Sequence, residues 1–172
     1  MKLTTTSFMD HVQHVIRFTS VPSFVRSVPM NFGDSGAGKT KADEWRTLST
    51  VYLPLALISY CFYSGKVKDT EFKDRFTKVI EHTMELVQAV KLVCQKSICQ
   101  SEIDAYDKHI KTYITDLETV HPTASFLPNM HMALHITDFL SLYGSAYSWW
   151  ANPFERLIYK LQETQSNNKI GE

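Results

Sequence analysis

Two histidines near the end of the chain have the spacing of a metal-binding pair. His131 and His135 are four residues apart, so on a helix both side chains project from one face. Two imidazoles placed in this way could bind the same zinc ion. Histidines at this spacing are also common on ordinary helix surfaces, and that interpretation stays open.

A carboxylate follows the histidine pair at a fixed distance. Glu155 comes 20 residues after His135, in the first turn of a helix that the Asn152-Pro153 sequence predicts. A carboxylate in this position could be a magnesium ligand. Taken alone, it is more simply a capping-box partner of Asn152, since the N-terminus of a helix favours a negative charge.

A glycine-rich segment matches the pattern of a phosphate-binding loop. Residues Gly33 to Thr40 read GDSGAGKT, which fits the P-loop at every position. A P-loop needs a buried parallel strand that leads into it, and here the preceding segment contains Pro29, which argues against a central strand. We therefore expect a flexible loop with no bound nucleotide.

Helical periodicity predicts the elements that must position these residues. Apolar residues recur at three-to-four spacing, and no stretch alternates with period two. The chain is therefore expected to be mainly α, a single helical domain over residues 1–172, with residues 18–41 as an irregular Gly/Pro-containing connector. Pro54 should kink or split the second helix. The predicted helices run over residues 6–17, 42–63, 69–96, 101–119 and 129–143 and begin again at 152; Ser101 and Asp104 are expected to cap the fourth, and Gly144 to end the fifth.

Composition narrows the classes of partner. The chain has 18 basic and 18 acidic residues, whereas an autonomous DNA-binding domain usually carries a basic excess. Three cysteines without a disulfide framework indicate a reducing compartment. The longest apolar run, Val51 to Tyr63, is too short to cross a bilayer, so no membrane partner is expected.

The joint arrangement near the C-terminus resembles a known family. His131-x3-His135 followed by Pro153-Phe154-Glu155-Arg156 is similar to the C-terminal catalytic region of CACTA-type DNA transposases. The resemblance is strong over residues 22–58 and 121–172 and weak between them. Further segments similar to fungal members of that family are KADEWRTL at 41–48, YLPLAL at 52–57 and NNKIGE at 167–172.

The resemblance implies a fold and a chemistry. Such transposases have an RNase H-like fold in which three carboxylates hold two magnesium ions, which activate the attacking oxygen and stabilise the leaving one. Glu155 matches the third carboxylate, on the helix that follows a helical insertion. The first two aspartates are expected before residue 1, so the chain is expected to be inactive alone, as a fragment of a nuclear DNA-cutting enzyme. The alternative is an inert helical interaction module derived from a transposon.

The resemblance also implies a structural zinc site. His131 and His135 match a histidine pair that works with a second ligand pair upstream, which in plant relatives falls near Asp43 to Arg46. Arg46 cannot bind zinc, so the site is incomplete or uses other residues. His11 and His14, three apart on the first helix, are a weak substitute.

Overall fold

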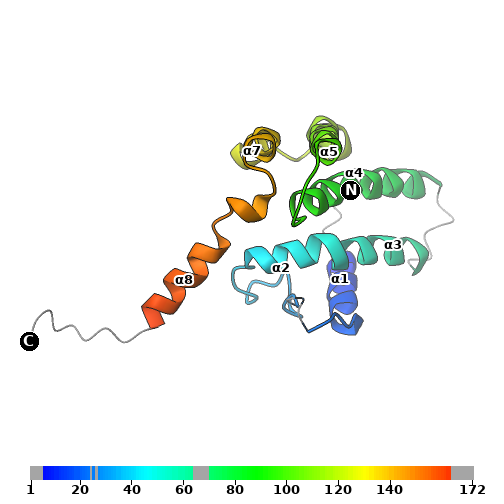
Figure 1. Ribbon diagram of the computed structural model, residues 1–172. Helices are drawn as coiled ribbons and strands as arrows, with labels where there is room; N and C mark the ends of the chain where they lie inside the picture. Colours follow the sequence, from blue (N-terminus) through cyan, green and yellow to red (C-terminus); the bar gives the residue numbers. More distant parts are fainter. Residues whose placement is uncertain (1–5, 24, 26, 64–69, 164–172) are drawn as a thin grey trace, which may run out of the picture.

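The computed structural model describes residues 6–23, 25, 27–63 and 70–163 and is 72% helix, with no strand among those residues (Figure 1). The predicted mainly α class is therefore confirmed. The elements in chain order are α1 (Thr6–Phe18), α2 (Ala42–Thr47), η1 (Leu48–Tyr52, a π-helix), α3 (Leu53–Tyr63), α4 (Thr70–Val93), α5 (Gln100–Val120), α6 (Pro128–Leu134), α7 (Ile136–Tyr143), η3 (Ala146–Ser148, a 3₁₀-helix) and α8 (Asn152–Glu163).

The predicted disturbance at Pro54 is confirmed. The helical stretch from Ala42 to Tyr63 is interrupted by the π-helix η1, which ends two residues before Pro54. Proline has no backbone N–H and its ring clashes with the carbonyl four residues earlier, at Thr50. Widening the helix just before Pro54 is one way to accommodate that ring.

A first hydrophobic core joins α1, η1 and α3 to the start of α4. From α1, the stripe of Phe8, Val12 and Ile16 is buried, as its spacing predicts. Tyr52 is 1% exposed at its centre, and Phe76 extends the core onto α4. The described residues between 19 and 41 form turns and loops, of which Val28 is buried in this core.

A second core lies between α4 and α5, with α6 and α7 packed on it. Ala89 of α4 meets Ile103, Tyr106 and Ile110 of α5, and Leu140 of α7 closes the cluster. The Tyr106 hydroxyl donates to the Ala133 carbonyl at 2.8 Å, which ties α6 to α5. Burial raises the pKa of Tyr106 far above its usual value, so the hydroxyl remains a donor. Because α4 contributes to both cores, it connects the two halves.

Two predicted boundaries are wrong. The cap of α5 is Cys99, whose backbone N–H donates to the Glu102 carboxylate at 2.8 Å, rather than a pair of Ser101 and Asp104. The helix predicted over 129–143 is two helices, α6 and α7, separated at His135. The predicted stop is confirmed, since Gly144 follows α7 with φ of 74°, a conformation that favours glycine.

The last helix extends away from the rest of the molecule. In Figure 1, α8 points outward beyond η3, and none of the other helices that the structure describes packs extensively against it. Its start at Asn152 agrees with the prediction. None of the helices in the described residues is long and apolar enough to span a membrane.

Candidate histidine and carboxylate site

The two histidines of the predicted metal pair face each other. His131 lies in α6 and His135 directly after it, with 3.2 Å between their Nε2 atoms and 4.9 Å between ring centroids. Two zinc–nitrogen bonds of about 2.0–2.1 Å at a tetrahedral angle place the nitrogens roughly 3.3 Å apart. The prediction that both side chains project from one face is confirmed, and the pair has the spacing of two ligands of one ion.

A carboxylate lies behind this pair. The Oδ2 atom of Asp138 is 3.6 Å from Nδ1 of His135, the nitrogen that faces away from His131. This separation is too long for a direct hydrogen bond, but histidine ligands of zinc commonly have a carboxylate on their second nitrogen. The sequence reasoning missed Asp138, although an acidic residue three positions after a histidine is a signal that could have found it.

In the part of the chain that the structure describes, no second ligand pair lies beside the histidines. Within the described ranges, no group of three or more His, Cys, Asp or Glu side chains is arranged to hold a metal. Zinc in a structural site almost always has four ligands. The histidine pair therefore supplies half of such a site.

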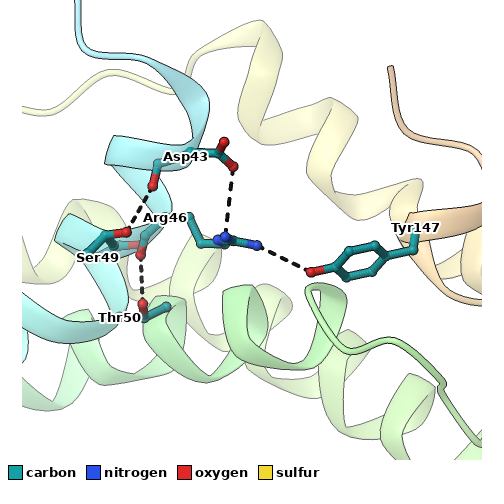
Figure 2. Close-up of polar contacts among 6 residues, drawn as sticks. Asp43, Arg46, Ser49, Thr50 and Tyr147 are labelled. Atoms are coloured by element: carbon teal, nitrogen blue, oxygen red, sulfur yellow. Dashed lines mark hydrogen bonds and ion pairs between the residues drawn. The ribbon is translucent and has the colours of Figure 1, made fainter. Parts of the chain in front are cut away.

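The segment that corresponds to the upstream pair has another arrangement, shown in Figure 2. The Arg46 guanidinium lies 3.8 Å from the Asp43 carboxylate and donates to the Tyr147 hydroxyl at 3.3 Å. The Arg46 carbonyl accepts bonds from Ser49 and Thr50 at 3.1 and 2.7 Å. Arg46 thus connects α2 to Tyr147 of η3, 101 positions further on. It occupies the position at which the zinc site would need a ligand.

A thiol lies beside the same arginine. Burial raises the pKa of Cys94, and the neighbouring Arg46 guanidinium opposes that shift. A neutral thiol is a poor metal ligand, because metals bind the thiolate. Cys94, directly after α4, therefore lies against Arg46 of α2 as a neutral thiol.

Glu155 lies where the sequence places it. It is in the first turn of α8, its backbone N–H donates to the Ala151 carbonyl at 3.0 Å, and its side chain is exposed. A magnesium ligand must share its ion with several waters, so an exposed carboxylate meets that requirement. The catalytic role that the resemblance implies for Glu155 stays a prediction.

The glycine-rich loop is tethered to α1. Gln13 donates to the Phe32 carbonyl and to the Asp34 carboxylate at 3.0 and 2.9 Å, and Gly33 has φ of 88°. This positive φ is what favours glycine there; a Cβ would also come within 2.3 Å of the Met9 methyl carbon, but that flexible side chain can move away. The described residues before the loop form turns and irregular chain instead of the strand that a P-loop needs.

A cavity beside α1 is lined by the other histidine pair that the sequence offers, His11 and His14. Its volume is about 510 Å³, and its lining includes His11, His14 and Ser59. His11 Nε2 lies 2.7 Å from the Ser59 hydroxyl, which itself donates to the Leu55 carbonyl, so the imidazole N–H is the donor to Ser59. Burial, and then the nearby His14, lower the pKa of His11. Since His11 already has this partner, it is a poor substitute for the missing zinc ligands.

Comparison with known proteins gives no relative. The chain matches no protein-family model, no curated protein and no solved structure. Its own residues therefore carry the functional argument.

Proposed function

We propose that this chain is a piece of a CACTA-type DNA transposase that contributes the insertion helices and the third metal-binding carboxylate, Glu155. In the complete enzyme, two magnesium ions would activate water or a 3′ hydroxyl and stabilise the leaving oxygen of a phosphodiester. The other two carboxylates would come from chain outside these 172 residues. The transposon ends would be the DNA substrate.

One observation carries the proposal. The Nε2 atoms of His131 and His135 lie 3.2 Å apart, and the next regular helix after α7, α8, has the exposed Glu155 in its first turn. The histidine pair and Glu155 thus follow one another in the same order as in the motif that resembles the transposase region, and both the imidazoles and the carboxylate are accessible. The absence of strands in the described residues fits an insertion, which would leave the RNase H-like sheet elsewhere in the enzyme.

The same proposal explains the neutral charge. A piece that adds one carboxylate and packing helices to a larger enzyme need not bind DNA by itself, so it needs no basic excess. A single carboxylate cannot hold two magnesium ions, and the chain alone is therefore inactive. Zinc at the histidine pair would be structural and would need ligands in addition to His131 and His135.

The test is to express the chain together with the reading frame that precedes Met1 in the genome. A longer protein with two further aspartates should nick transposon-end DNA in the presence of magnesium, and Glu155→Gln should reduce nicking to background. Glu118→Gln, an exposed carboxylate of α5, is the matched control and should leave nicking unchanged. Magnesium-dependent nicking by the 172 residues alone would contradict the proposal, as would an active Glu155→Gln form of the longer protein.

The second candidate is an inert helical interaction module. It is favoured by the apolar side chains exposed on α8, including Phe154, Leu157 and Leu161, which suit a binding surface better than a water-filled metal site. A preceding reading frame that lacks the two aspartates would support this candidate. In that case Glu155→Gln should change neither folding nor partner binding.

A further inference from the structure

The outer stripe of α8 is apolar and uncovered. Phe154, Leu157, Ile158 and Leu161 follow the three-to-four spacing of one helix face and are 66%, 55%, 53% and 64% exposed. A helix of 12 residues is marginal in water without a surface to pack on. The sequence of α8 therefore requires a partner surface.

A second uncovered apolar surface lies just before α8 in the chain. On α7, Phe139, Leu142 and Tyr143 share one face and are 38%, 72% and 60% exposed. Trp149 lies beside them, with its ring 5.6 Å from that of Phe139. We refer to these four residues as the α7 patch.

The connection between the two surfaces is short and held to the body of the molecule. The backbone N–H groups of Trp149 and Trp150 both donate to the Ala146 carbonyl, at 3.2 and 2.8 Å, and the Trp149 indole donates to the Gly144 carbonyl at 3.1 Å. Only Ala151 separates this fixed segment from Asn152, the first residue of α8. A hinge of one residue gives α8 little room to turn back onto its own α7 patch while those bonds hold.

We infer that the partner is a second copy of this chain. In a twofold dimer, α8 of each copy packs on the α7 patch of the other, so that both uncovered surfaces are satisfied at once. A short hinge is the feature that favours such an exchange over intramolecular packing. Net charge is zero, so two copies approach without mutual repulsion.

The area available is that of a stable interface. Four side chains of α8 and four of the α7 patch come from each copy, and each is between about one third and three quarters exposed. With roughly 80 Å² buried per side chain, the dimer covers on the order of 1,300 Å², within the usual range for specific interfaces. The polar residues of α8 beside its apolar stripe include both Glu155 and Lys160, so the rim of the interface carries both signs of charge.

Two single variants test the exchange. The unmodified chain should sediment as a dimer, whereas Leu157→Glu on α8 and Leu142→Glu on α7 should each give monomers. Mixing the two variants should recover a heterodimer, because the intact α8 of one can pack on the intact α7 patch of the other. Phe62→Glu, at a 77% exposed position on α3, is the matched control and should remain dimeric.

A longer hinge gives an independent measurement. Six Gly/Ser residues inserted after Ala151 allow α8 to reach its own α7 patch, and the protein should then become monomeric with unchanged helical circular dichroism. A monomeric parent chain overturns the inference. A dimer that survives Leu142→Glu but not Leu157→Glu also overturns it, because α8 would then pair with α8 of the other copy.

Discussion

The N-terminal and C-terminal regions of this chain differ in how far their apolar side chains are buried. Around Tyr52 each of α1, η1 and α3 contributes buried apolar side chains to one cluster, while Leu55, Ile58 and Phe62 of α3 stay exposed. Between Phe126 and Leu161 most large apolar side chains are exposed, and the α7 patch and the stripe of α8 are the clearest examples. The first region is held by its own packing, while the second has the composition of a core without a covering layer. The difference teaches that apolar periodicity predicts helices equally well whether or not the chain itself buries their faces.

The largest expected effect comes from replacing one aromatic residue in each region by alanine and comparing the loss in the free energy of unfolding. Tyr52→Ala should lower the free energy of unfolding by about 3–5 kcal/mol, because it removes a fully buried ring from the first core. Phe154→Ala, at a 66% exposed position, should change it by only about 0.5 kcal/mol in a monomeric background such as Leu142→Glu. Urea unfolding followed by circular dichroism measures both. Equal losses would contradict the division into a packed and an uncovered region.

A smaller effect concerns acid stability of the α4–α5 pair. His82 is 5% exposed, its Nε2 lies 2.8 Å from the Tyr113 carbonyl, and its ring contacts that of His121 at 5.2 Å. Burial, and then His82, lower the pKa of His121 in the folded protein. The unfolded state then binds protons more readily, so this contribution is complete above a pH of about 6.5 and is lost as the pH falls below it.

The variant that isolates this effect is His121→Gln. Unfolding free energy should fall between pH 7 and pH 5 in the parent chain and should fall less in His121→Gln. His135→Gln is the matched control on the exposed side and should keep the parent pH dependence. If the free energy of unfolding falls more steeply between pH 7 and pH 5 in His121→Gln than in the parent chain, His121 is not the cause of the acid sensitivity.

The smallest effect is expected at the histidine pair. His131→Ala should change the free energy of unfolding by no more than about 0.5 kcal/mol, because the side chain is exposed. Zinc added to the parent chain should bind weakly, with two protein ligands, and His131→Ala or His135→Ala should abolish that binding. Calorimetric titration measures it, with His14→Ala as the control. Tight zinc binding that survives both substitutions would place the metal elsewhere.

Local signals in the sequence predicted most of the helices, and tertiary contacts account for what it missed. Pro54 and Gly144 acted as expected because their backbone restrictions operate within a few residues. The break at His135 follows from its surroundings. There the Ala133 carbonyl is taken by the Tyr106 hydroxyl, and the His135 N–H bonds to Met132 with the tighter spacing of three residues. Such a contact between α5 and α6 leaves no local trace in the sequence.

The candidate site was predictable only where it depends on helical spacing. His131 and His135 face each other because four residues make about one turn. The Ser59 partner of His11 is 48 positions away, and the link from Arg46 to Tyr147 spans 101, so neither could be read from spacing. Cys99 was missed as a helix cap because serine, threonine, aspartate and asparagine are the usual residues there.

The π-helix before Pro54 has a consequence for the evolution of this chain. A π turn holds one extra residue compared with an α turn, so α2 is rotated by about 100° relative to a straight continuation of α3. Because of that rotation, side chains from the continuous helical stretch point in two directions. Arg46 points toward Tyr147, and Leu57 points into the first core. Loss of a single residue from 48–52 would keep all the other side chains but misalign the two faces by about a quarter turn. The relative orientation of α2 and α3 therefore depends on the number of residues in η1. Insertions or deletions there should be tolerated far less than substitutions.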